Sequence, residues 1–548
     1  MVLATKWRCH MYITYQEKKG VEYATLTKSI RNGTQVKKEY TNLGRVIDKE
    51  RNIFKNRERG VFTFDPETGL YGTCPEDCVP PKDTRRGQYY TVDRKRHSLL
   101  VLRFGDVFFF DSFLKKIKIL DVIDAIPYNN KDTLHALLAY YSLSSMTNYH
   151  AKDWYELSYA KVLYPKAVLS SQRISETLTA IGMEESKRQF FVKYYDFVRR
   201  MQMNDIKGDY GLGNALDDAI LLDSCGLPND ARLPITSVNN HNGIISLEFR
   251  LIYVVQQKTG LPLFFRYVAG NVIDASTVKR TIEELKGMGV NTKFALLDSG
   301  YYNGKNADIL IDAGISFISR VGGTHGIYLD AKKNERDDLE RKENLIQHNG
   351  RVYYIKEIKV KIGEKKDKDA YGYLCLDTTM RNEKQKRINA EISDEEMDDD
   401  NLYEAMQTAG LFMLVCTRKV EKKYLLGLYF TRNQVEEIFK IGKGNGKMLP
   451  ICVESEEALR GHLLITFISS VITKILMDRL ANTGWSPASI YSILQYQVAQ
   501  IFPDYLLTSE PVKNMNDIYK HFRITCPSSI PYKATADELA RMGVDRID

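Results

Sequence analysis

The chain has 548 residues, of which 43% are hydrophobic and 27% are charged, and its formal net charge is +8 at pH 7. This length exceeds what one compact core accommodates, so we expect several domains. The composition excludes a fibrous protein and a wholly disordered one. The small positive charge permits a polyanionic partner, although solubility alone explains a charge of this size. The eight cysteines are scattered along the chain, which favours free thiols over a zinc site.

The N-terminal region, residues 1–95, is predicted to be basic and β-rich. Residues 11–50 alternate between apolar and polar side chains, and Asn32 with Gly33 is a turn signal, so we expect short strands. Lysines and arginines recur around Tyr89 and Tyr90, an arrangement that can bind phosphates. A solvated surface explains the same pattern, and the residues alone favour that interpretation.

Helical periodicity marks two further regions. In residues 96–205, apolar side chains recur at intervals of three and four, which predicts helices that pack against one another. Residues 476–548 are predicted to be a helical region as well, with Ser486–Phe502 as its clearest segment.

No membrane segment or secretory signal is expected. The longest apolar stretch, Leu463–Leu476, is shorter than the roughly 20 residues that span a bilayer. Met1–His10 carries basic residues among its apolar ones, which does not suit a signal peptide. The sequence therefore predicts a soluble, cytoplasmic protein.

Residues 206–325 and 413–475 are predicted to form the two parts of a mixed α/β core. The first part reads as three strands, a helix, a strand, a helix and a strand, with Gln256–Gly260 as the turn of a hairpin. The second part resumes with a strand and a helix. Residues 326–412 between them alternate like strands and are highly charged, which predicts a β-rich insertion. Its acidic segment Asp394–Asp400 lacks the spacing of a calcium loop, so a solvated loop is expected there.

Four polar residues in the second part of the core have a helical spacing. Tyr429, Arg432, Glu436 and Lys443 follow one another at steps of three, four and seven residues, which places them on one face of a helix. The neighbouring face is apolar and can pack against a sheet; it carries Val435, Ile438, Phe439 and Gly442. A carboxylate between cations suits phosphodiester chemistry, because carboxylates bind hard metal ions and the cations bind phosphate oxygens. A surface helix with an ordinary Arg432–Glu436 pair is the alternative.

Two aspartates come directly after apolar runs. Asp223 follows "AILL" and Asp298 follows "FALL", so we expect each at the carboxyl end of a buried strand. A carboxylate there must be solvated, paired or metal-bound, since an isolated buried charge is costly, and open α/β sheets bind their ligands at such strand ends. Each aspartate alone is more often a cap or turn residue. Together with Glu436 they predict a metal site, and we set Glu437 aside because it lies about 100° away around the helix.

The motifs around these residues resemble a known family. "LLDSCG" at Leu221–Gly226, the block Leu296–Val321 and "YFTRNQVEEIFKIGK" at Tyr429–Lys443 are similar to insertion-sequence transposases of the DDE type, in the group with the Tyr-Arg-Glu-Lys helix signature. The resemblance covers residues 206–325 and 413–475 most strongly. It implies a ribonuclease-H-like core, and some members carry a β-rich insertion between the second aspartate and the glutamate.

The resemblance also implies a chemistry. Asp223, Asp298 and Glu436 would hold two Mg²⁺ ions, with Mn²⁺ as a substitute, for in-line attack on phosphate. Arg432 and Lys443 would contact the DNA backbone, and Tyr429 would orient or stack on it. The partners would be the element's terminal inverted repeats and target DNA, joined by a homodimer at synapsis in the bacterial cytoplasm, at the nucleoid.

Alternatives remain open at this stage. A catalytically silent DNA-binding derivative would carry the same motifs, and a ribonuclease-H-like nuclease without strand transfer would share the whole site. The insertion contains no tryptophan, so hairpin formation on DNA is undecided. The resemblance also suggests that residues 1–95 recognise DNA ends, through basic residues such as Arg85 and Arg86 and, just beyond them, Arg94 and Arg96.

Overall fold

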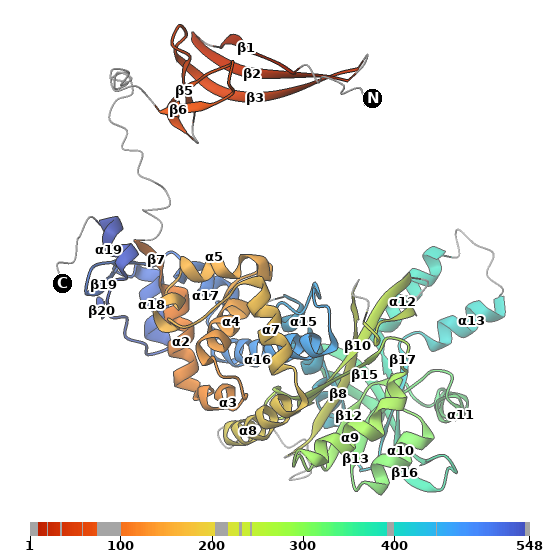
Figure 1. Ribbon diagram of the computed structural model, residues 1–548. Helices are drawn as coiled ribbons and strands as arrows, with labels where there is room; N and C mark the ends of the chain where they lie inside the picture. The colour runs from red at the N-terminus through yellow and green to blue at the C-terminus, as the bar shows by residue number, and fades with distance from the viewer. Residues whose placement is uncertain are drawn as a thin grey trace. The chain divides into compact units, whose positions relative to one another are not determined.

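The computed structural model describes residues 9–18, 20–32, 35–56, 59–73, 100–202, 218–229, 233–241, 244–391, 399–444 and 446–542. The chain forms two compact units, Met1–Val92 and Asp93–Asp548, and each is described by itself (Figure 1). The stretch from Arg85 to Arg96 lies outside the described residues, so its role in recognising DNA ends stays a prediction.

Unit 1 is an antiparallel sheet whose strands follow one another in chain order: β1 (Cys9–Lys18), β2 (Val21–Asn32), β3 (Gln35–Asp48), β4 (Ile53–Asn56), β5 (Gly60–Phe64) and β6 (Tyr71–Thr73). β1, β2 and β3 are longer than the short strands expected for residues 11–50, and β3 continues through Gly44. Gly44 has a φ of +97°, and the β2–β3 register shifts opposite it, between Ala24 and Thr25. A Cβ at Gly44 would lie 2.2 Å from the carbonyl oxygen of Lys55, so glycine lets the strand bend without ending.

The central sheet of unit 2 has the order β11-β10-β8-β12-β13-β17-β16-β15-β14, with β9 paired to β10. Its strands are β8 (Ile220–Pro228), β9 (Ser237–His241), β10 (Ile244–Gln256), β11 (Pro262–Ala269), β12 (Phe294–Leu297), β13 (Ser316–Val321), β14 (Leu345–His348), β15 (Arg351–Ile362), β16 (Lys368–Asp377) and β17 (Leu411–Cys416). Strands β8, β10 and β11 pair antiparallel, whereas β8, β12 and β13 pair parallel. Helices α9 (Val278–Gly287) and α10 (Gly304–Asp312) provide the crossovers that parallel strands require. The predicted mixed α/β sheet and its hairpin are confirmed.

The strands of the predicted insertion belong to this same sheet. β17 pairs with β13 on one side and with β16 on the other, so β14, β15 and β16 lengthen the core sheet (Figure 1). The insertion also contains helices, namely α11 (Gly326–Glu335), α12 (Thr378–Glu391) and α13 (Asp399–Thr408). A strand edge exposes unpaired backbone groups, and the pairing of β17 with β16 satisfies those groups where the core sheet would otherwise end.

Most of the remainder of unit 2 is helical. They include α2 (Gly105–Ile117), α3 (Leu120–Asp124), α4 (Lys131–Leu143), α7 (Ser171–Ile181), α8 (Glu184–Gln202), α16 (Glu456–Arg479), α17 (Pro487–Leu494), α18 (Lys513–His521) and α19 (Ala536–Met542). The prediction that Ser486–Phe502 is wholly helical is wrong. α17 ends at Leu494, and β18 (Val498–Ile501) then pairs with β7 (Val101–Arg103) and β19 (Tyr505–Thr508). This pairing joins distant parts of the chain, which local periodicity does not report.

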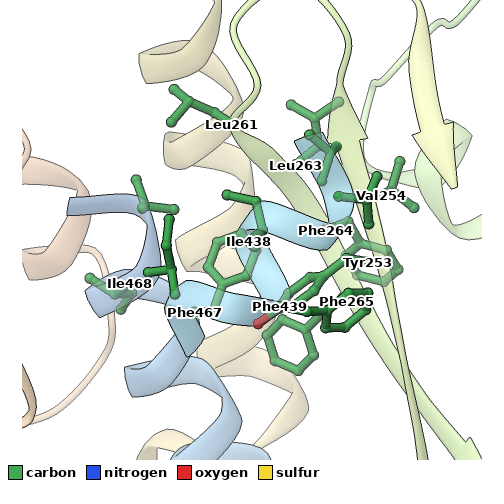
Figure 2. Close-up of a cluster of buried hydrophobic side chains, with 14 of the residues drawn as sticks. Tyr253, Val254, Leu261, Leu263, Phe264, Phe265, Ile438, Phe439, Phe467 and Ile468 are labelled. Atoms are coloured by element: carbon green, nitrogen blue, oxygen red, sulfur yellow. The ribbon is translucent and has the colours of Figure 1, made fainter. Parts of the chain in front are cut away.

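Within the described part of the chain, α16 alone is long and apolar enough to cross a membrane, and 94% of its apolar window is buried inside the protein. The neighbouring elements that bury α16 can be named. α16 and α15 (Asn433–Gly444) pack together on the β10–β11 hairpin, as the close-up of their shared cluster shows (Figure 2). Phe467 of α16 lies in ring contact with Tyr253 and Phe265 of the hairpin at centroid distances of 6.1 and 5.5 Å.

Phe467 is expected to be a large contributor to the stability of unit 2. Its side chain is 0% exposed and also contacts the rings of Phe190, Phe191 and Tyr194. Phe467→Ala should lower the free energy of unfolding by about 3–5 kcal/mol, because it removes apolar contact and leaves a cavity. Phe467→Leu fills more of the space and should cost clearly less. Urea titration followed by tryptophan fluorescence measures both, and equal losses for the two variants would contradict the cavity argument.

Candidate active site

Asp223 and Asp298 lie side by side on neighbouring strands. The parallel pairing of β8 with β12 ends with Leu222 opposite Leu297. Each aspartate is the residue that follows in the chain. Asp298 follows the end of β12, as predicted. Asp223 is instead inside β8, which continues to Pro228 on its pairing with β10 alone. The expected strand end at Asp223 is therefore only the end of the parallel pairing, where burial also gives way to partial exposure.

Arg432 joins the two aspartates to Glu436. Its Nη1 lies 3.2 Å from Asp223 Oδ2 and 3.6 Å from Asp298 Oδ2, and its Nη2 lies 3.4 Å from Glu436 Oε1. The Arg432 side chain is 17% exposed, so these carboxylates hold it in a largely buried position. The carboxylates raise the pKa of Arg432 although burial opposes them. The structure thus brings the three predicted carboxylates together around one guanidinium.

The segment that carries these residues is not one helix. α14 (Lys422–Phe430) ends before Thr431, and Arg432 lies in a tight turn before α15 begins. In this turn the amide of Arg432 donates to Tyr429 O at 3.1 Å, and the Thr431 hydroxyl donates to Leu428 O at 2.7 Å. A threonine hydroxyl that bonds to the backbone competes with helical hydrogen bonds. The expectation of one continuous helix is corrected, and Tyr429 belongs to α14.

Glu436 and Glu437 point to different partners. Glu436 contacts Arg432, whereas Glu437 Oε2 lies 3.0 Å from the Nζ of Lys474 on α16. The step of about 100° between successive helical residues accounts for this separation. The two neighbouring glutamates therefore form a natural pair for experiment, since only one of them faces the aspartates.

Burial perturbs Asp223 more than its ion pair stabilises it. Its side chain is 16% exposed. Burial raises the pKa of Asp223 from its ordinary 3.8 to about 6, against the lowering effects of the Ser224 amide and Arg432, while the nearby Asp298 and Asp274 carboxylates raise it further. An aspartate with a pKa this high is destabilised in its charged form at neutral pH. Such an environment favours an additional cation beside it.

Asp223→Asn is expected to stabilise the metal-free protein. The folded pKa exceeds the unfolded one, so stability is lost as the pH rises from about 4 to about 6, and the cost persists above that window. A shift of about two pH units corresponds to about 2–3 kcal/mol, which the neutral amide avoids. In EDTA, thermal unfolding should therefore show a higher Tm for Asp223→Asn at pH 8 and no gain below pH 4. A lower Tm at pH 8 would contradict this expectation.

Behind Asp223 lies a polar network that sequence reasoning missed. Asp274 accepts hydrogen bonds from Ser224 Oγ at 2.5 Å and from Arg250 Nη1 at 2.8 Å. Ser224 follows Asp223 on β8, so its side chain leaves the opposite face of the strand. The partners of Asp274 come from β8 and β10, which are distant from it in the sequence, so no local pattern predicts them. The network anchors β8 directly beside the candidate site.

Tyr429 and Lys443 occupy different positions around the site. Tyr429 is 4% exposed, and the guanidinium carbon of Arg432 lies 6.0 Å from its ring centroid. Burial, with the Asp298 carboxylate, raises the pKa of Tyr429 to about 12. The buried ring of Tyr429 packs near Arg432, and its predicted role toward DNA stays a prediction. Lys443 is exposed, and its Nζ lies 2.8 Å from the Sγ of Cys225, which shares the strand face of Asp223.

The donor chemistry of the site suits a hard divalent cation, because all three side chains around Arg432 are carboxylates. The described residues nevertheless contain no group of three or more His, Cys, Asp and Glu side chains placed to hold a metal ion. The guanidinium of Arg432 lies between the carboxylates and supplies positive charge there. The residue types fit the predicted ions.

Among the comparisons with known proteins, a family match bears on these residues. No curated protein matches the chain. Among solved structures, the chain is similar to a piggyBac transposase in a synaptic complex with hairpin DNA, at 10% identity over 77% of each chain and a TM-score of 0.35. That similarity is too low to support an argument. Residues 246–472 match the family described as "Transposase DDE domain". This segment, which is similar to a transposase DDE domain, carries Asp298, Arg432 and Glu436 and begins after Asp223.

Proposed function

We propose that this protein is a DNA transposase that cuts at the terminal inverted repeats of an insertion sequence and joins the 3′ ends to target DNA. The observation that carries the proposal is the gathering of Asp223, Asp298 and Glu436 around Arg432. Two of these carboxylates, Asp298 and Glu436, lie in the segment that matches the transposase DDE domain. The proposal thus rests on the geometry of the three carboxylates and on the family match of the segment that holds two of them.

We further propose that the core is ribonuclease-H-like. The support is the order of its sheet, in which the antiparallel strands β11, β10 and β8 are followed by the parallel strands β12 and β13. Helix α9 connects β11 to β12, and α10 connects β12 to β13. This arrangement brings Asp223 and Asp298 to adjacent positions, and α15 reaches them from the side where it packs on the hairpin.

In this mechanism the chain positions the reacting groups. Asp223, Asp298 and Glu436 would hold two Mg²⁺ ions, which would activate water and then a 3′-hydroxyl and stabilise the charge that develops on phosphate. Arg432 neutralises the carboxylates in the metal-free protein, because its guanidinium pairs with all three of them. Tyr429 orients Arg432 by packing against it. Lys443, exposed beside β8, would contact the DNA backbone, because an ammonium attracts phosphate without reading base identity.

The proposal names the partners of the protein. They are double-stranded DNA at the element's ends and at the target, and a second copy of the chain, since synapsis joins two ends. The protein would act in the bacterial cytoplasm, at the nucleoid. Mn²⁺ would substitute for Mg²⁺.

The deciding experiment uses the full-length protein and the DNA that flanks its reading frame. A labelled duplex carrying the flanking inverted repeat is incubated with increasing Mg²⁺ or Mn²⁺, together with an unlabelled target duplex. The expected result is a nick that leaves a 3′-hydroxyl at the element's end, followed by a joined product of higher mass. Cleavage without joining would identify a nuclease and overturn the strand-transfer part.

One observation favours a second candidate, a catalytically silent DNA-binding derivative. Arg432 lies between the carboxylates, and the described residues form no ready metal cluster. In that case the same titration would show end-specific binding with no cleavage at any metal concentration. The two candidates therefore differ in the product of one experiment.

A further inference from the structure

A cavity of about 840 Å³ lies in unit 2 at the C-terminal ends of helices α2, α8, α16 and α18. Its basic lining residues define what we call the basic pocket: Lys116, Lys118, Arg200, Arg479, His521 and Arg523. In the part of the chain that the structure describes, no aspartate or glutamate lines this cavity. None of its lining residues belongs to the candidate active site.

Helix termini explain part of this charge. The C-terminus of a helix carries about half a negative charge, so basic residues there are stabilising. Lys116 Nζ donates to the backbone carbonyls of Phe522 and Arg523, and His521 Nε2 lies 3.0 Å from Arg479 O. Four such termini contribute roughly two negative charges against the lysines and arginines of the pocket. A surplus of about three positive charges remains.

The other cations of the basic pocket have no side-chain partner among the described residues. The side chains of Lys118, Arg200, Arg479 and Arg523 are exposed there and form no ion pair or hydrogen bond with another described residue. Two acidic residues, Asp121 and Asp196, line a neighbouring hollow that shares only Arg200 with the pocket. Concentrated like charge destabilises a folded protein unless it meets an anion.

The floor of the pocket indicates which part of an anion it meets. Phe113, Phe197 and Phe522 form it, and they are only 2%, 3% and 6% exposed. These rings pack inward and present no free face on which a base can stack. The accessible groups are guanidinium and ammonium ions, which bind phosphate oxygens.

We propose that the basic pocket binds the phosphate backbone of duplex DNA at a place separate from the candidate active site. The proposal rests on the proposed function, which supplies DNA as the partner. A duplex carries one charge per about 1.7 Å of its axis, so a DNA backbone that lies along the pocket offers phosphates to both Arg200 and Arg479. Contacts of this kind hold DNA without selecting its sequence.

The test removes two charges from the pocket and compares the same loss elsewhere. The variant is Arg200→Gln with Arg479→Gln, both in the last turns of helices. The matched control is Lys333→Gln with Arg387→Gln, exposed residues of α11 and α12. The full-length proteins bind a labelled random-sequence duplex in EDTA, and fluorescence anisotropy gives the Kd across a salt series.

The pocket variant should bind roughly tenfold more weakly at low salt, and its slope of log Kd against log salt should fall by about two. The control should stay within about twofold of wild type. Arg200→Lys with Arg479→Lys keeps both charges and should restore the slope, which separates lost charge from lost folding. Equal losses in pocket and control variants, or no loss in either, would overturn the proposal.

The outcome is separable from that of the proposed function, because the binding measurement needs no cleavage. A weaker, less salt-dependent pocket variant supports the pocket even if the wild-type protein never cuts DNA. Cleavage by a wild-type protein whose pocket variant binds DNA normally supports the active site and overturns the pocket.

Discussion

Asp223→Asn, Asp298→Asn and Glu436→Gln are each expected to lower the cleavage rate of end-bearing DNA by about 100-fold or more, with little change in DNA affinity. The substitutions keep the shape of the side chains and remove the charge that binds a divalent ion, and even second-shell changes at metal sites cost about 10–100-fold. Single-turnover cleavage of a labelled duplex in Mg²⁺ and in Mn²⁺ measures the rates, and anisotropy in EDTA measures the affinity.

Glu437→Gln is the matched control for this series. Glu437 adjoins Glu436 in sequence but pairs with Lys474 instead of Arg432. Its neutralisation should leave cleavage within about twofold of wild type, because a partly exposed ion pair contributes little. Near-wild-type cleavage by any of the three site variants would remove that residue from the site. An equal loss in Glu437→Gln would show that the charge of α15, and not the position of Glu436, matters.

Arg432→Gln is expected to slow cleavage by about 100-fold while strengthening the binding of Mn²⁺. The guanidinium now supplies the positive charge between three carboxylates, so its loss leaves their repulsion uncompensated and favours a metal ion in its place. The rate falls because a preorganised cation beside the reacting phosphate is worth about 10²–10³-fold. Calorimetric titration with Mn²⁺ and single-turnover cleavage report the two effects separately.

The loss in Arg432→Gln should be the same on every DNA sequence. A cation that acts on phosphate does not distinguish bases, so the ratio of cleavage between true ends and scrambled duplexes should stay at its wild-type value. Arg418→Gln is a suitable control. Arg418 donates a hydrogen bond to Ser316, the first residue of β13, at the opposite end of that strand from Val321. Weaker Mn²⁺ binding by Arg432→Gln would mean that Arg432 orders the carboxylates instead of competing for them. A changed end preference would assign it to base recognition.

Local pattern was sufficient for the parts of the fold that depend on neighbours in sequence. The alternation around Gln256–Gly260 predicted the β10–β11 hairpin, and the apolar runs before Asp223 and Asp298 predicted two buried strands. The spacing of Val435, Ile438 and Phe439 predicted the face of α15 that packs on the sheet, and all three side chains are buried there. These features follow from the periods of helix and strand, which a single segment carries by itself.

Other features depended on pairings between distant segments. Strands β14, β15 and β16 belong to the core sheet because β17 pairs with β13 on one side and with β16 on the other. The segment predicted as the end of a helix forms β18 instead, because it pairs with β7. The same is true of Asp274, which joins the site only through Ser224 and Arg250. No period within one segment reports such partners.

The division is sharpest at Arg432. From the sequence alone, the types and spacing of Asp223, Asp298, Arg432 and Glu436 determined that acidic and basic groups would occur together in one core. Only the tertiary structure decided that Arg432 turns toward the carboxylates and away from solvent, that Tyr429 is buried behind it, and that burial raises the pKa of Asp223 to about 6. Spacing fixes the face of a helix on which a side chain lies, whereas its partner and its solvation depend on what other segments bring to that face.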